Sequence, residues 1–215
     1  MTSTRFINAN HPRIETFVRR TIGGETDPVE KAKMLFTTVR DCVRYDPYAI
    51  DFAPETFIAS EVLQSPGAFC IPKAGLLCAC ARAAGIKAML GFADVRNHLN
   101  TRKLSELIGT GLFIYHGYVA LELNGKWRKV TPSFNIELCR RFGVEPMTFD
   151  GENDALLHAY DGQGRRHMEY VNDHGVFAEL PFERLKAAFH ETYPKLLTLT
   201  GQRAHSRFED EKPLA

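Results

Sequence analysis

The sequence predicts an α+β protein, with helices in the first part of the chain and antiparallel strands in the second. Apolar residues recur at helical spacing up to Gly85, and runs typical of strands begin at Ile86. Asn124-Gly125 lies between two such runs and is a strong signal for a β-hairpin. With 215 residues, the chain is long enough to bury a core without disulfides or a structural metal.

Three long helices are predicted before the strands. The first begins at His11-Pro12 and ends at Gly23-Gly24, because proline suits a first turn and glycine a helix end. The second begins at Asp27-Pro28, with Glu30 three residues after the cap, and ends near Tyr45-Asp46-Pro47. The third runs from Cys70 to Gly85, and its small apolar residues indicate burial on most sides.

The remaining elements follow from turn residues and apolar periodicity. We expect irregular structure over 46–59, a short helix over 60–64, strands over 86–95, 113–123 and 126–131, helices over 104–108, 136–142 and 182–192, and a second hairpin from 156–160 and 165–171. We expect one domain over 1–199, with a core of about 27–135 and an extension of about 136–199, followed by a flexible tail over 200–215.

Composition excludes several classes of function. The chain has 27 Lys and Arg against 26 Asp and Glu, a net charge of +1 that argues against nucleic-acid or membrane partners. The N-terminus lacks an apolar signal core, and five cysteines suggest reduced thiols, so a cytoplasmic location is expected. No zinc ligand spacing and no phosphate-binding loop occurs in the sequence, so neither a metal nor a cofactor is expected.

Cys70 is the candidate nucleophile. It lies where a turn meets the start of a buried helix, and the free N–H groups there favour a thiolate and can hold an oxyanion. Position alone is equally consistent with a small buried structural residue.

His116 is the candidate base. A two-residue turn at Asn124-Gly125 would pair His116 with Ser133 and place Thr131 diagonally across on the same face. A histidine packed in the sheet without a chemical role is the alternative interpretation.

The order of several motifs resembles the transglutaminase-like superfamily of thiol enzymes over roughly Lys31 to Phe134. The motifs are Arg44-Tyr45-Asp46, Gly67-Ala68-Phe69-Cys70, Arg82-Ala83-Ala84-Gly85-Ile86, Gly91, Tyr115-His116-Gly117-Tyr118 and Gly125-Lys126-Trp127. The resemblance implies a papain-like fold, in which the nucleophile helix packs on an antiparallel sheet that carries the base. It also implies that Cys70 is the nucleophile and His116 its base.

The third member of the family's catalytic triad departs from the pattern. An Asp-Pro-Thr segment typical of the family reads Thr131-Pro132-Ser133 in this chain. A threonine can accept a hydrogen bond from imidazole but gives no charge support to imidazolium. Thr131 is our first choice as the orienting residue, Asn135 is a second, and an acid such as Asp94 or Asp150 is a third.

Other polar residues are weaker site candidates. Gln64 precedes Cys70 by six residues and is a possible oxyanion donor, although a solvated helix end explains it equally simply. Asp94 is a candidate for the cleft rim. The sequence assigns no role to His98, His167 or His174.

The resemblance implies acyl transfer through a thioester on a peptide or protein carboxamide, or on a small amide. Hydrolysis and transamidation stay open, as does the oligomeric state. One alternative is a catalytically silent relative that binds a peptide or protein partner. Another is an enzyme similar to arylamine acetyltransferases.

Overall fold

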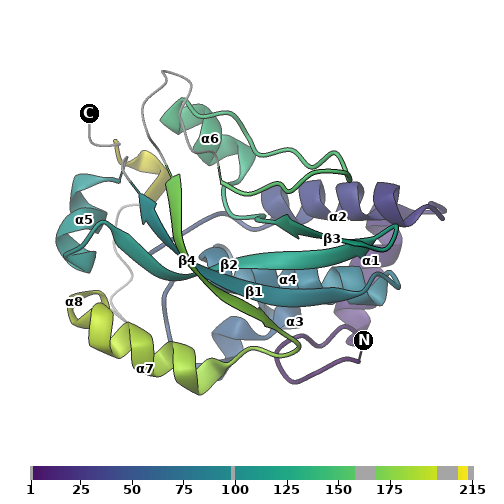
Figure 1. Ribbon diagram of the computed structural model, residues 1–215, viewed down its shortest axis with the longest axis horizontal. Coiled ribbons are helices and arrows are strands. Elements are labelled where there is room, and N and C mark those ends of the chain that lie inside the picture. Colours follow the sequence, from purple (N-terminus) through teal and green to yellow (C-terminus); the bar gives the residue numbers. More distant parts are fainter. Residues whose placement is uncertain (1, 98–99, 158–167, 198–207, 213–215) are drawn as a thin grey trace.

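The computed structural model describes residues 2–97, 100–157, 168–197 and 208–212. Helices fill the first part, and strands alternate with short helices in the second (Figure 1). The elements are α1 (Pro12–Ile22), α2 (Pro28–Cys42), η1 (Pro54–Phe57), α3 (Ala59–Val62), α4 (Cys70–Ala83), β1 (Ala88–Asn97), α5 (Arg102–Ile108), β2 (Leu112–Leu123), β3 (Lys126–Val130), α6 (Ile136–Phe142), β4 (Met168–Phe177), α7 (Phe182–Thr192), α8 (Pro194–Leu197) and η2 (Phe208–Asp210).

The four strands form one antiparallel sheet in the order β3-β2-β1-β4. The predicted hairpin is confirmed around the Asn124-Gly125 turn, where Leu123 pairs with Lys126 and Val119 with Val130. The strand β3 ends at Val130, so the predicted pairing of His116 with Ser133 is not formed. The second predicted hairpin is wrong in its partner. β4 pairs with β1 instead, and Leu156 and Leu157 lie outside any strand, while residues 158–167 are outside the described part.

Helix α4 is the centre of the core. It packs on β1 and β2 and is also contacted by α1, α2 and α3 (Figure 1). Every residue from 71 to 82 is buried, which explains why its sequence is small and apolar on all sides. The buried Lys73 ammonium is satisfied by the carbonyl oxygens of Arg40, at 2.8 Å, and of Val43 at the end of α2.

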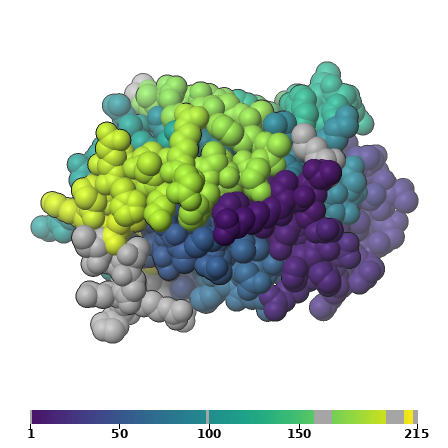
Figure 2. Space-filling model, turned by 90° about the horizontal axis from the view of Figure 1, so that it is seen from below, coloured from purple at the N-terminus to yellow at the C-terminus, as the bar shows by residue number. Residues whose placement is uncertain are grey.

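The N-terminal segment lies against the region around α7 on one face of the molecule, where purple meets yellow-green in Figure 2. The rings of Phe6 and Phe182 stack with centroids 5.2 Å apart. The buried Arg82 side chain of α4 donates to the carbonyl oxygens of Thr2, Ala88 and Ala178, at 3.2, 3.0 and 2.8 Å. One guanidinium therefore joins the N-terminal segment, β1 and the segment before α7.

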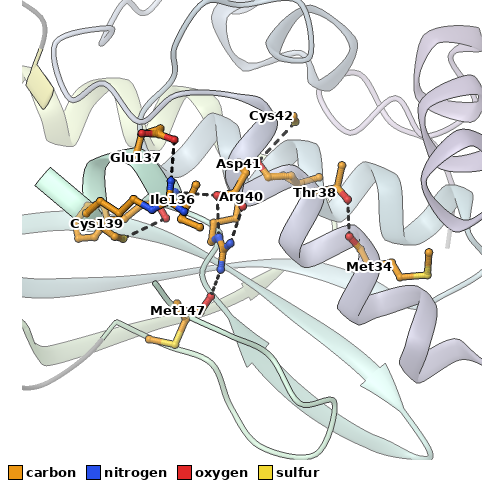
Figure 3. A network of polar contacts seen from close by, with 12 residues as sticks. Met34, Thr38, Arg40, Asp41, Cys42, Ile136, Glu137, Cys139 and Met147 are labelled. Atoms are coloured by element: carbon orange, nitrogen blue, oxygen red, sulfur yellow. Dashed lines mark hydrogen bonds and ion pairs between the residues drawn. The ribbon is translucent and has the colours of Figure 1, made fainter. Parts of the chain in front are cut away.

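The start of α6 and the loop that follows α6 are fixed to the end of α2 (Figure 3). The Ile136 N–H donates to Asp41 Oδ1 at 2.9 Å, while Arg40 pairs with Asp41 and donates to the Met147 carbonyl at 2.6 Å. These contacts fix the start of α6 and the loop after it to the end of α2.

The C-terminal segment differs from the expected flexible tail. Residues 208–210 form a 3-10 helix in which Phe208 and Glu209 are buried. Short segments with a single apolar residue show no periodicity, so the sequence pattern could not predict this docking. None of the helices in the described residues is both long and apolar enough to span a membrane.

Candidate active site

Cys70 is the first residue of α4, and its side chain is partly buried against the sheet. Burial raises the pKa of its thiol to about 11, while the N–H groups of Gly117, Ile71 and Cys70 itself act in the opposite direction. The sulfur is thus close to the helix start and to β2. At neutral pH the group is a protonated thiol that is already surrounded by N–H donors.

His116 lies on β2, one residue after Tyr115, whose backbone has a left-handed φ of 52°. Beside this irregularity, the pairing of β1 and β2 shifts between Ala93 and Val95. The imidazole is 5% exposed, and burial lowers its pKa to about 4. His116 is therefore a neutral imidazole at pH 7, able to accept a proton only if its surroundings change or a reaction supplies charge.

Cys70 and His116 line the same cavity, as the proposed dyad requires. The free space is about 30 Å³, enough for one or two water-sized groups. The other lining side chains are almost all apolar: Tyr45, Pro47, Ile50, Phe69, Leu104, Ile108, Phe113, Ile114, Phe189, Tyr193 and Leu196. A reaction in this cavity would be shielded from water, which strengthens every electrostatic contact in it.

Thr131 is buried directly after β3, and no described residue forms a hydrogen bond with its hydroxyl oxygen. Within the described residues, His116 Nε2 and Ser133 Oγ likewise lack partners. One buried histidine and two buried hydroxyl groups thus have unused hydrogen-bonding capacity. Buried polar atoms without partners are uncommon and often mark a site where a ligand, a water or a rearrangement completes the contacts.

Tyr170 of β4 is the residue that the sequence analysis missed. Its ring meets His116 edge-on, with centroids 6.5 Å apart. Burial raises the pKa of Tyr170 to about 12, and the neighbouring Thr131 hydroxyl partly opposes this shift. The strand pattern around Tyr170 was visible in the sequence, but only the pairing of β4 with β1 brings it to His116.

The alternative orienting residues have other partners. Asn135 Oδ1 accepts from the Tyr45 N–H at 2.9 Å, and its side chain does not cap α6. Asp94 Oδ1 accepts from the Tyr115 N–H at 3.0 Å and lies 2.7 Å from His174 Nε2. The Asp150 carboxylate accepts from N–H groups of its own turn. The hydrogen bonds of these three side chains therefore go to groups other than His116.

Gln64 is exposed and lines a different groove, which includes Pro12, Thr38 and Cys42. As an oxyanion candidate it is therefore a wrong choice, because α3 and the following turn direct it away from the cavity of Cys70.

His174 stacks on Tyr115, with ring centroids 4.1 Å apart. His98 and His167 lie outside the described residues. In the described part of the chain, no cluster of three or more histidine, cysteine or acidic side chains is suited to hold a metal ion.

Gly117 gives a direct test of the contact between α4 and β2. A Cβ at Gly117 would lie 2.9 Å from Ile71 Cα and 3.2 Å from the Cys70 carbonyl oxygen, and backbone cannot rotate away. We expect Gly117→Ala to lower the free energy of unfolding by about 1–3 kcal/mol, as overpacking does, and to slow alkylation of Cys70 by iodoacetamide.

The matched control for this variant is Gly75→Ala in the same helix. A Cβ there would meet nothing nearer than the Phe57 carbonyl oxygen at 3.9 Å. Alanine also favours a helix, so urea unfolding should show equal or greater stability. Equal stability of the two variants would contradict the close approach of β2 to the start of α4.

Comparison with known proteins supports the predicted family and fold. Residues 15–132 match the family model described as the transglutaminase-like superfamily. An arylamine N-acetyltransferase from Salmonella typhimurium is similar with a TM-score of 0.50 and 13% identity over 90% of this chain and 72% of that one. This likeness confirms a papain-like α+β fold.

Two further solved structures are similar over a smaller share of their length. A candidate cysteine protease from Cytophaga hutchinsonii gives a TM-score of 0.48 with 13% identity, over 82% of this chain and 53% of that one. A candidate protease from Parabacteroides distasonis gives 0.42 with 18% identity, over 61% of this chain and 28% of that one. The chain thus spans about a quarter to a half of these two proteins. No curated protein sequence matches it.

Proposed function

Because the chain belongs to the transglutaminase-like superfamily, a family of cysteine-dependent acyl transfer, we propose that it transfers acyl groups with Cys70 as nucleophile and His116 as base. One observation carries this proposal. The cysteine at the start of a buried helix and the histidine of the neighbouring strand line one apolar cavity, although 45 positions separate them. This arrangement of thiol and imidazole is what nucleophilic catalysis needs.

The reaction proposed here starts from a neutral pair. Cys70 Sγ attacks the carbonyl carbon of an amide and its thiol proton passes to His116, so that a C–S bond forms as imidazolium appears. N–H groups at the start of α4 stabilise the oxyanion, and one such donor is worth about 3 kcal/mol. His116 returns the proton to the leaving amine as the C–N bond breaks. Water or a second amine then attacks the thioester.

Thr131 and Tyr170 are the proposed positioning residues. Thr131 occupies the place after β3 where the family pattern has an aspartate, and Tyr170 packs edge-on against the His116 ring. Neither carries a negative charge at neutral pH, so the imidazolium receives hydrogen-bonding and packing support but no ion pair. The pair of Cys70 and His116 should therefore stay neutral until an acyl donor is bound.

The proposed donor is a peptide or protein carboxamide or a small amide with an apolar portion, because the cavity walls beside Cys70 are apolar. The acceptor is water or an amine. Five cysteines, all free in the structure, suit a reducing compartment such as the cytoplasm.

Intact-mass measurement after exposure to a library of amide, ester and acetyl-coenzyme A donors tests the proposal. We expect one acyl group on the wild-type chain and none on Cys70→Ala. Cys42→Ala is the matched control, because Cys42 is an exposed thiol outside the cavity and its removal should leave the adduct unchanged. An adduct that survives Cys70→Ala would overturn the assignment of the nucleophile.

A silent, peptide-binding domain is the second candidate function. It is favoured by one observation, the buried and unpaired hydroxyl of Thr131, which carries no charge where the family pattern has an aspartate. Retained peptide binding together with no adduct from any donor would select this function over catalysis. An adduct formed from acetyl-coenzyme A alone would instead favour an acetyltransferase.

A further inference from the structure

The docked C-terminal segment, residues 208–211, lies next to the proposed catalytic cavity. Phe208 and His116 both line a second hollow. This hollow shares Tyr45, Leu104 and Phe113 with the cavity that contains Cys70. His116 therefore lines two neighbouring cavities. Cys70 lines the first, and Phe208 lines the second.

Phe208 is held by an aromatic nest. Its ring centroid lies 5.9 Å from Tyr45, 5.9 Å from Tyr48 and 5.4 Å from Phe142, and the side chain is 6% exposed. The nest is made by the loop after α2 and by the end of α6. These elements are far apart in the sequence, and Figure 1 shows the yellow turn beside α6. Aromatic pairs at such spacing bind a ring well and specifically.

The three acidic residues that follow Phe208 each meet a basic side chain. Glu209 lies 3.7 Å from Arg44, Asp210 lies 2.5 Å from Arg141, and Glu211 lies 3.5 Å from Lys103. The Glu211 carboxylate also accepts from Tyr48 Oη at 2.9 Å and Thr101 Oγ1 at 2.7 Å. The rim of the aromatic nest is thus basic at three separate points. Each of its three basic side chains faces one of the three acidic residues of the segment.

The contacts of residues 208–211 are those of a bound peptide. The described part of the segment pairs with no strand. It packs on α6 and is held by one buried ring and three charged side chains. A buried aromatic anchor surrounded by charged contacts is typical of peptide recognition. The receptor side would keep these features if the segment left.

We propose that this recess is a peptide-binding subsite of the His116 cavity, specific for an aromatic side chain followed by acidic residues, and that residues 208–211 occupy it in cis. The recess consists of the aromatic nest and the basic rim formed by Arg44, Lys103 and Arg141. The assignment of the bound peptide as a substrate rests on the proposed function. The binding itself does not.

Occupation in cis has a consequence for chemistry. A polypeptide that reaches His116 from this side must displace Phe208, so the segment competes with it at an effective concentration set by the connecting chain. Substrates with an aromatic residue followed by acids would displace it best. The subsite would therefore select substrates and also limit reaction with others.

Peptide binding in trans tests this proposal without relying on catalysis. The probe is a fluorescent synthetic peptide with the sequence of residues 206–213, and the protein is the full chain carrying Cys70→Ala. We expect weak binding to this chain and binding tighter by about 10-fold or more when Phe208→Ala and Glu211→Gln are added to loosen the cis segment. A probe with alanine in place of its phenylalanine should not bind.

Two controls keep the outcome interpretable. Arg141→Gln removes one charge of the rim, and it should weaken binding of the probe to the loosened chain and reduce the salt dependence of binding. In the chain that retains Cys70, loosening the segment should speed alkylation of Cys70 by iodoacetamide, and added probe should slow it again. Thermal melting of each variant shows that it is folded.

The subsite would be overturned if the probe bound equally well to the Cys70→Ala chain with and without the changes at Phe208 and Glu211. It would also be overturned if the probe with alanine in place of its phenylalanine bound as well as the original probe. Binding as expected with no acyl adduct on Cys70 would refute the proposed function and leave the subsite in place. An acyl adduct on Cys70 without probe binding would refute the subsite and leave the proposed function in place.

Discussion

Thr131→Asp is expected to convert the neutral pair of Cys70 and His116 toward a thiolate and an imidazolium. Burial holds the pKa of His116 at about 4. A nearby carboxylate would oppose this effect of burial, but position 131 carries a threonine. A carboxylate within reach of an imidazole raises its pKa by about 1–3 units. Because each unit changes the population of the charged pair tenfold, alkylation of Cys70 at pH 7 should accelerate by about 10-fold or more.

The rate of iodoacetamide labelling from pH 5 to pH 10 measures this effect. In the wild-type chain the rate should rise with pH toward the raised pKa of about 11 of Cys70, without a plateau near neutrality. In Thr131→Asp the rate at pH 6–7 should exceed that of the wild type, because the new imidazolium supports the thiolate.

Thr131→Asn is the matched control, since it has nearly the same volume as the aspartate variant and no charge. It should label like the wild type. Both variants place a larger polar group at a position that is 1% exposed, so each should lower the free energy of unfolding, by about 1–3 kcal/mol if the new group lacks a full set of partners. Equal labelling of the two variants would show that Thr131 does not face the imidazole.

Local signals made much of the fold predictable. Proline and glycine at helix ends fixed the limits of α1 and α4, and α6 and α7 match their predicted bounds of 136–142 and 182–192. The two-residue turn at Asn124-Gly125 determined the register of β2 and β3 by counting alone. These features depend on residues that are close in sequence, so local sequence patterns were sufficient to predict them.

Contacts between distant segments were not predictable in this way. The partner of β4 is chosen by packing across the whole sheet, so Tyr170 could not be placed beside His116. Gln64 is six residues from Cys70, yet a turn directs it to another groove. Phe208 is one apolar residue among charges, and only the folded aromatic nest shows that it is an anchor.

Stability in acid should depend strongly on His116. Its pKa is about 4 in the folded chain and 6.5 in an ordinary exposed imidazole, so the unfolded chain binds more protons between these two values. The stability associated with the neutral imidazole is complete above pH 6.5 and is lost as the pH falls toward 4. A difference of about 2.5 units corresponds to about 3 kcal/mol.

Urea unfolding of the wild type and His116→Gln at pH 7.5 and pH 4.5 isolates this contribution. Other acidic groups titrate in both chains and cancel in the comparison, so the wild type should lose about 2–3 kcal/mol more than the variant. Parallel losses would mean that the imidazole is not held neutral by burial. Thr131→Asp provides a test that links this prediction with the labelling experiment. A carboxylate that raises the pKa of His116 must also reduce the excess loss of unfolding free energy in acid. Faster labelling without that reduction would contradict an effect that acts through His116, because a carboxylate acting directly on Cys70 would disfavour the thiolate and slow labelling.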